Sequence, residues 1–134
     1  MFDEVLIHKL LESARTARDA AYAPYSGNFK VGAAVLTADG QIFTGCNIEN
    51  ASFGASMCAE RVAIFSAIAA GQRQIKALAV IADTPQPVAP CGLCRQVLSE
   101  FSADCQVIMA NLHGNYQVLT LDQLLPVAFK FPPL

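Results

Sequence analysis

The sequence has few charged residues and no excess of positive charge. Charged side chains make up 15% of its 134 residues, with 9 Lys and Arg against 11 Asp and Glu, so the formal net charge is −2. A protein that binds many phosphate groups needs a basic surface. We therefore predict no nucleic acid polymer as a partner.

The sequence also lacks long apolar runs and the charge pattern of a secretory leader. The apolar runs at 59–70 and 77–82 are broken well before the roughly 18 consecutive apolar residues that a membrane span needs. Residues 1–4 carry acidic groups where a leader would carry basic ones. We therefore expect no membrane partner and a cytoplasmic location.

The composition favours a single packed domain. Hydrophobic residues make up 54% of the chain and the mean hydropathy is +0.39, which is too apolar for a disordered chain. The length fits the usual domain of about 100–200 residues, so we expect one domain over residues 1–134. This apolar fraction is higher than a small core requires, which indicates a buried interface between subunits.

The periodicity of the chain alternates between helix and strand. Apolar residues spaced three and four apart predict an amphipathic helix within 3–22, with an apolar stripe that includes Leu6, Leu10 and Ala14. The further helices are expected at 58–71, 91–101 and 121–125, the first of them apolar nearly all round and therefore buried, and the strands at 31–36, 42–46, 77–82, 107–110 and 116–119. Asp39-Gly40 predicts a hairpin between the first two strands. The pattern indicates an α/β architecture with a mixed sheet whose first two strands are antiparallel.

Cysteines form the most informative pattern. Cys91 and Cys94 make a C-x-x-C motif where a loop gives way to a predicted helix, and Cys58 occupies the same position before another helix. The N-terminus of a helix stabilises a thiolate, which is the form that binds metal, and a spacing of three places two sulfurs on one side of the helix. Zinc with three protein ligands keeps its fourth position for water, which is typical of a catalytic site.

Charged neighbours of these cysteines extend the hypothesis. Three thiolates around a divalent ion leave a net negative charge, which opposes the loss of a proton from the bound water. Arg61 and Arg95 each follow a cysteine closely and could donate hydrogen bonds to sulfur. Glu60 follows Cys58 by two residues, and its side chain can reach the water as a general acid and base.

From the residues alone, the cysteines also fit two different kinds of site. A C-x-x-C motif occurs in thioredoxin-like redox proteins, and Cys46 or Cys105 could complete a structural zinc site with four thiolates. Both of these cysteines adjoin apolar segments, which favours burial in the core instead. His8 and His113 have no companion motif and are expected at the surface.

Several motifs together resemble the small cytidine deaminases. The matching segments are Ala23–Ser26, Val31–Ala34, Gly45–Ala51, Cys58–Arg61, Pro90–Gln96, and Leu124–Pro126 with Phe129. Cys-x-Glu followed by Pro-Cys-x-x-Cys is the three-cysteine form of the zinc deaminase signature. The resemblance implies a three-layer α/β/α fold with a five-stranded mixed sheet, a homotetramer, and hydrolysis of cytidine and deoxycytidine to uridine and deoxyuridine.

The same resemblance implies roles for the residues of the metal centre. Its zinc ligands correspond to Cys58, Cys91 and Cys94, with one zinc per chain. Its proton-transferring carboxylate corresponds to Glu60.

Substrate contacts follow from the same comparison of motifs. It implies that Asn47 and Glu49 bind the ribose hydroxyls and that Phe29 packs on the pyrimidine. It also implies that the backbones of Ala59 and Cys91 touch the base. Phe129 would reach the site of a neighbouring subunit. From the residue type alone, the alternative for Phe29 is a core side chain.

The chain departs from the usual family pattern at two places. Gly27-Asn28 separates Ser26 from Phe29 where the family usually has a single residue, and Phe53 stands where the family often has Tyr. A runner-up hypothesis is a deaminase of another small cytosine compound, such as a nucleoside antibiotic. Asn47 and Glu49 favour the plain nucleoside.

Overall fold

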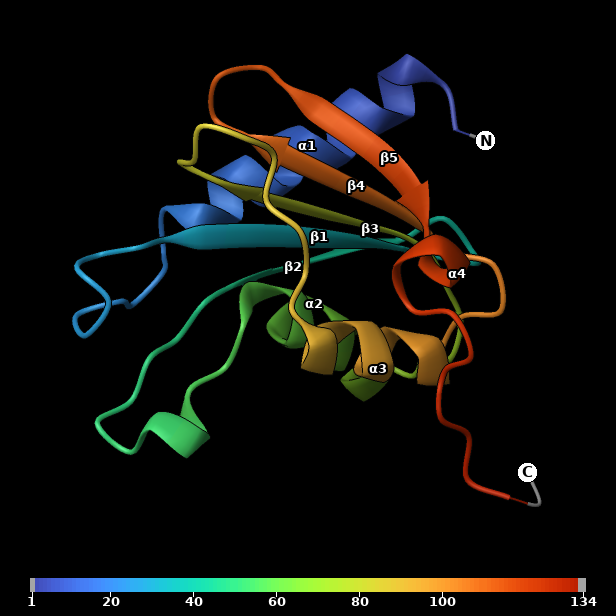
Figure 1. Ribbon diagram of the computed structural model, residues 1–134. Coiled ribbons are helices and arrows are strands. Elements are labelled where there is room, and N and C mark those ends of the chain that lie inside the picture. The colour runs from blue at the N-terminus through green and yellow to red at the C-terminus, as the bar shows by residue number, and fades with distance from the viewer. Residues whose placement is uncertain (1, 133–134) are drawn as a thin grey trace.

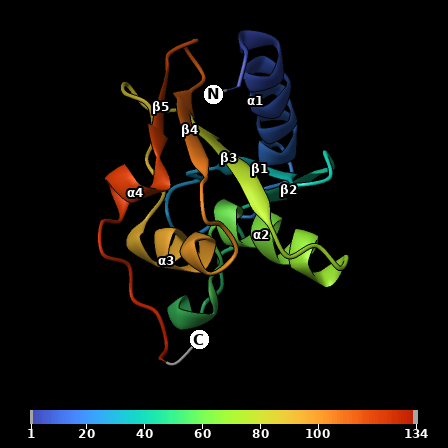
Figure 2. The ribbon, with the colours of Figure 1, turned by 90° about the vertical axis from the view of Figure 1, so that its right-hand side faces the viewer.

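The computed structural model describes residues 2–132 and consists of one sheet with helices on both faces (Figures 1 and 2). The helices are α1 (Glu4–Arg18), α2 (Ala59–Ala69), α3 (Gly92–Glu100) and α4 (Leu121–Leu124), with a 3₁₀ turn η1 at Phe53–Ala55. The strands are β1 (Val31–Thr37), β2 (Ile42–Cys46), β3 (Ile75–Ala82), β4 (Gln106–Asn111) and β5 (Tyr116–Thr120). Among residues 2–132, no helix is long and apolar enough to cross a membrane.

The sheet is mixed, as the sequence pattern predicts. Its five strands lie in the order β2-β1-β3-β4-β5. Strand β1 pairs antiparallel with both β2 and β3, strands β3 and β4 are parallel, and β5 returns antiparallel to β4. The parallel pair requires a crossover, and α3 lies on it.

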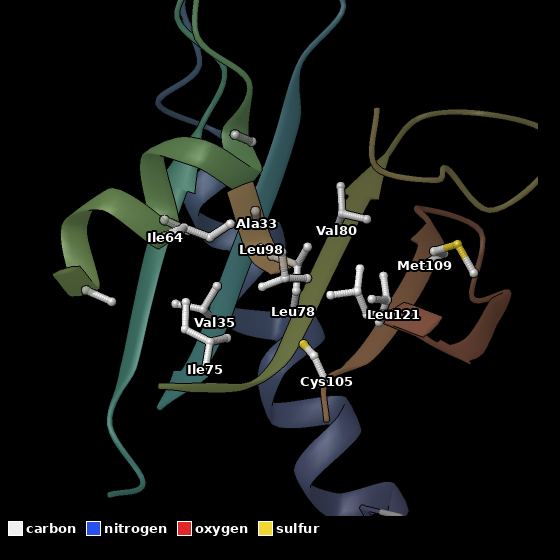
Figure 3. Close-up of a cluster of buried hydrophobic side chains, with 14 residues drawn as sticks. Ala33, Val35, Ile64, Ile75, Leu78, Val80, Leu98, Cys105, Met109 and Leu121 are labelled. Atoms are coloured by element: carbon white, nitrogen blue, oxygen red, sulfur yellow. The ribbon is translucent and has the colours of Figure 1, made fainter. Parts of the chain in front are cut away.

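Two apolar cores lie on the two faces of the sheet. Along β1, Ala33 and Val35 face α2 and α3, while Ala34 and Leu36 face α1. This alternation follows from the period of two along a strand. Figure 3 shows the larger of the two clusters, in which Leu78 and other strand side chains meet helical side chains. The three-layer α/β/α arrangement is thereby confirmed.

Helix α1 is shorter than expected, and its buried stripe is shifted. Asp3 caps its N-terminus by accepting a hydrogen bond from the Leu6 N–H, and the buried residues are Ile7, Leu10 and Ala14. The helix ends at Arg18 because the chain then turns to pair with another segment. Tyr22 forms a backbone bridge with Ile48, which the helical spacing through residue 22 did not indicate.

The expectation that the second helix is buried all round is wrong for the single chain. Ala63, Ile64 and Ala67 of α2 are fully buried, but Phe65 is 42% exposed on the opposite face. A helix at the margin of the molecule can bury only the face that it turns to the sheet. The apolar residues on its outer face are therefore left for another partner.

Two glycines allow helices to pack closely on the sheet. A Cβ added at Gly45 in β2 would lie 2.5 Å from the Ala63 nitrogen and 2.6 Å from the Ala59 oxygen, both in α2. A Cβ at Gly32 in β1 would overlap the Ala14 carbonyl oxygen of α1. Both helices can therefore sit on their strands only because these positions have no side chain.

We predict that Gly32→Ala lowers the free energy of unfolding by about 1–3 kcal/mol, because α1 must move away from β1. Gly54→Ala is the matched control, since an added Cβ there meets nothing within 4 Å, and it should stay within about 0.5 kcal/mol of the original chain. Urea denaturation at saturating zinc measures both. Equal effects of the two substitutions would contradict the close-packing argument.

Candidate active site

Helices α2 and α3 lie on the same side of the sheet (Figure 1). Three cysteine sulfurs converge where these helices begin. Cys58 and Cys91 are the N-cap residues of the two helices, and Cys94 lies in the first turn of α3. The Sγ atom of Cys91 lies 3.7 Å from that of Cys58 and 3.3 Å from that of Cys94, and all three atoms lie within 4.8 Å of one another. Thiolates bound to tetrahedral zinc at about 2.3 Å stand about 3.8 Å apart. The cluster therefore fits one zinc ion.

The thiol of Cys58 ionises more readily than an ordinary thiol. Hydrogen bonding from Cys94, with further contributions from Arg61 and Cys91, lowers the pKa of Cys58 to about 5. Hydrogen bonding to Cys58 and burial raise the pKa of Cys94. The cluster thus holds a thiolate at neutral pH, which is the form that ligates metal.

The two arginines beside these cysteines have different partners. Arg61 donates from Nη2 to the Cys58 sulfur at 3.5 Å, as its position suggested. Arg95 does not contact a sulfur and instead donates from Nε to the Pro90 carbonyl at 2.9 Å and from Nη1 to the Leu124 carbonyl at 2.9 Å. The sequence-based expectation for Arg95 is therefore wrong. Its side chain holds the backbone that precedes Cys91.

Glu60 lies in the first turn of α2 and is only 4% exposed. Burial raises the pKa of Glu60 to about 7, and the negative charge of Cys58 adds to this rise. A carboxyl group with a pKa in this range can both accept and donate a proton at neutral pH. The side chain lines the same pocket as Cys58 and Cys91.

This pocket has a volume of about 390 Å³, which lies within the range of small-molecule sites. It brings together the sequence-predicted residues Phe29, Asn47, Glu49 and Ala59 with the metal centre. Phe29 is 41% exposed and is a wall of the pocket, not a core residue.

Further lining residues were not anticipated from the sequence. They are Val31, Ser56, Met57, Val80, Val88 and Ala89. Met57 directly precedes Cys58, and Val88 and Ala89 lead into Pro90-Cys91, so their closeness to a ligand could have indicated them. Val31 and Val80 belong to strands and look like any core residue.

The polar side chains at the pocket rim are engaged with backbone. Asn47 Oδ1 accepts from the Val31 N–H at 2.8 Å, and Asn47 Nδ2 donates to the Phe29 carbonyl at 2.8 Å. Glu49 Oε1 accepts from the N–H groups of Tyr25 at 2.7 Å and Ser26 at 3.1 Å. A hydrogen bond from the Ser26 side chain and these backbone donors hold the pKa of Glu49 below its usual range. Glu49 is therefore an ionised hydrogen-bond acceptor at neutral pH.

Phe53 and the 24–29 segment form the outer rim. Phe53 is 74% exposed and meets Tyr25 edge to face, with ring centroids 6.0 Å apart. Gly27 and Asn28 both have left-handed backbone, with φ of 71° and 64°. The additional residue is therefore accommodated in a tight turn, and Phe29 still reaches the pocket.

Phe129 lies away from this pocket. It is 67% exposed on the C-terminal segment, and its carbonyl accepts a hydrogen bond from Gln96 at 3.1 Å. A separate hollow beside Ser99 and Glu100 includes it. Within one chain, Phe129 therefore does not complete the site.

The remaining cysteines and the histidines lie outside the metal centre. Cys105 is buried, as expected of a core residue. Cys46 is only half-buried, so the expectation that it lies in the core holds only in part. His113 is exposed, and its Nε2 atom lies 3.2 Å from Oδ1 of Asp83. His8 packs edge to face on Tyr116. Neither histidine joins the cysteine cluster.

Comparisons with known proteins agree with this geometry. The family model "Cytidine and deoxycytidylate deaminase zinc-binding region" matches residues 5–110. A cytidine deaminase of Halalkalibacterium halodurans is 52% identical over 90% of this chain and 91% of its own, and one of Sporosarcina psychrophila is 50% identical over 92% and 91%. The crystal structure of a cytidine deaminase from Burkholderia pseudomallei has a TM-score of 0.87 at 53% identity, and the match covers 91% of this chain and 98% of that one. The chain therefore belongs to the cytidine and deoxycytidylate deaminase zinc-binding family.

Proposed function

We propose that this chain hydrolyses cytidine and deoxycytidine to uridine and deoxyuridine, with release of ammonia. The observation that carries the proposal is a buried glutamate that lines the same pocket as Cys58 and Cys91, two of the three cysteines whose sulfurs converge. The cytidine deaminases similar to this chain support the choice of substrate.

Cys58, Cys91 and Cys94 would hold one zinc ion per chain. Bound zinc supplies a water molecule of lowered pKa as the nucleophile. Arg61 donates to the Cys58 sulfur and withdraws negative charge from a set of three thiolates, which would otherwise oppose the ionisation of that water.

Glu60 is the proton carrier in this proposal. Its carboxylate takes a proton from the attacking water and delivers it to N3 of the pyrimidine, which makes C4 more electrophilic. The oxygen of that water bonds to C4. Glu60 then takes the proton of the resulting C4 hydroxyl and passes it to the amino nitrogen. The C4–N bond breaks, ammonia leaves, and C4 keeps its oxygen as a carbonyl. A buried carboxyl group beside the reacting atoms can serve in all of these transfers.

The substrate is held by the rim. A carboxylate has more acceptor positions than its two backbone donors use, so Glu49 can also accept a sugar hydroxyl, and Asn47 retains one N–H for another. Phe29 packs on the pyrimidine, and the backbone of Ala59 contacts the base.

Residues 1–134 act as one cytidine deaminase-like domain within a cytoplasmic homotetramer. The apolar side chains left exposed on one chain support assembly, including Phe65 on α2, Leu93 on α3 and the rim residue Phe53. In the tetramer, Phe129 contributes to a neighbouring site. A reducing compartment suits the site because its three thiols must stay reduced to hold zinc.

The purified protein should convert cytidine to uridine, and the change in ultraviolet absorbance measures this conversion. Removing zinc with a chelator should abolish conversion and release thiols for titration, and adding zinc back should restore activity, because the metal supplies the nucleophile. A redox protein would instead show free thiols before the chelator is added. Zinc-loaded protein that leaves cytidine unchanged would contradict the proposal, and other cytosine compounds would then be tried.

Replacing the proton carrier should separate chemistry from metal binding. We expect Glu60→Gln to lower kcat by about 10²–10⁴-fold, with about one zinc per chain still present by atomic absorption. Glu12→Gln, on the exposed face of α1, is the matched control and should retain full activity. Activity of Glu60→Gln close to that of the original chain would remove Glu60 from this role.

The assembly proposal predicts a particle of about four times the 14.3 kDa mass of one chain. Light scattering after size-exclusion chromatography measures this mass. Phe65→Ser should reduce it, because the exposed face of α2 then loses its largest apolar side chain. A monomer at all concentrations would contradict the tetramer without affecting the assignment of the metal centre.

A further inference from the structure

The segment that leads to Cys91 has an unusual backbone. Residues 83–90 connect β3 to α3, and Figure 1 shows this connection descending from the end of β3 to the start of α3. Pro85, Pro87 and Pro90 lie in it and have no N–H groups, so it can form few hydrogen bonds of its own. Its position must therefore be set by donors and acceptors from other parts of the chain.

Contacts from β4 and α3 hold this segment, in addition to the pair that His113 Nε2 forms with Asp83 Oδ1 at its first residue. Near its start, Asn111 Nδ2 donates to the Pro85 carbonyl at 3.2 Å. In its middle, the Val88 N–H donates to the Ala110 carbonyl at 3.3 Å. At its end, Arg95 of α3 holds the Pro90 carbonyl. The contacts to Pro85 and Val88 come from the last residues of β4.

The Asn111 side chain is hydrogen-bonded through both its oxygen and its nitrogen. It is 2% exposed, and its Oδ1 accepts from the N–H groups of His113 at 3.0 Å and Asn115 at 3.1 Å, in the turn between β4 and β5. The same amide thus joins that turn to the proline-rich segment. Its oxygen serves the turn, and its nitrogen serves the segment.

The further buried polar groups have evident roles. Among residues 2–132, the buried polar or charged residues besides Asn111 are Thr37, Asn47 and Glu60. Asn47 and Glu60 line the pocket, and the Thr37 hydroxyl accepts from the Gln41 N–H in the hairpin. Asn111 does not line this pocket. Burial of an amide costs free energy unless its hydrogen bonds are made within the protein, so the contacts of Asn111 need an explanation.

We propose that Asn111 is a positioning residue for the metal centre, acting through the Pro85 carbonyl on the segment that carries Cys91. The three prolines fix φ at their own positions, which leaves the segment fewer backbone rotations that could absorb a shift at Pro85 before Cys91. The segment also supplies Val88 and Ala89 to the pocket wall. This inference rests on the proposed zinc site but needs no substrate.

Two substitutions separate the hydrogen bond to Pro85 from the turn. Asn111→Asp keeps the oxygen that accepts from His113 and Asn115 but replaces the donor to Pro85. Gly114→Ala keeps Asn111 and strains the turn, because Gly114 has φ of 90°. Asn111→Ser is a second variant at the same position, since its short side chain can still accept from the turn but does not reach Pro85.

Zinc release to an excess of chromophoric chelator and the absorption spectrum of the cobalt-substituted protein measure the effect. We expect both Asn111 variants to release zinc about tenfold faster and to shift the cobalt bands. Gly114→Ala should lower the urea midpoint but leave release within about twofold and the spectrum unchanged.

Two results would overturn the inference. Asn111 variants that are less stable in urea but keep the original release rate and cobalt spectrum would show a purely structural role. Equal changes in Gly114→Ala would assign the effect to the turn. These measurements use no nucleoside, so they do not depend on the substrate. If the zinc-loaded protein failed to deaminate cytidine, the proposed function would be contradicted, but the test of Asn111 would remain valid.

Discussion

The convergence of three thiol groups is the constraint on which the rest of the structure depends. Sulfur atoms from two helix starts must approach within a few ångströms, although Cys58 and Cys91 are 33 residues apart. The sheet makes this possible, because α2 and α3 pack on the same face of it. Gly45 lets α2 lie directly against β2, so the absence of one side chain helps to set the height of Cys58 above the sheet.

Electrostatics then distinguish the acidic groups around the pocket. Cys58 is stabilised as a thiolate by hydrogen bonds that include one from Arg61. Glu60, two residues later, is buried where its proton is retained more easily. Glu49 sits at the rim and is kept ionised by donors from the 24–29 segment. Cys58 and Glu49 are therefore ionised at neutral pH, whereas Glu60 can hold or release its proton there, because their surroundings differ.

Local patterns made much of this fold and site predictable. The hairpin, the two helix starts at cysteines and the order of elements depend on short-range signals, such as Asp39-Gly40 and the spacing of Cys91 and Cys94. Contacts between distant segments were not accessible in this way. The partner of Arg95 is a carbonyl group, which has no signature in the sequence, and the end of α1 depends on the pairing of Tyr22 with Ile48. Burial of α2 was overestimated because an apolar face does not say which chain covers it.

Around the pocket, several polar side chains form hydrogen bonds with backbone groups of neighbouring loops. Asn47 fixes Phe29 and Val31, Glu49 fixes the turn before Phe29, and Arg95 fixes Pro90. Most pocket walls are loops, which without such contacts would be mobile. A polar side chain that satisfies a carbonyl or an N–H removes that freedom before any ligand arrives, and preorganised groups do not have to reorganise during the reaction. Side-chain to backbone hydrogen bonds therefore hold the loop walls of this site, while the helix starts and the sheet place its metal centre.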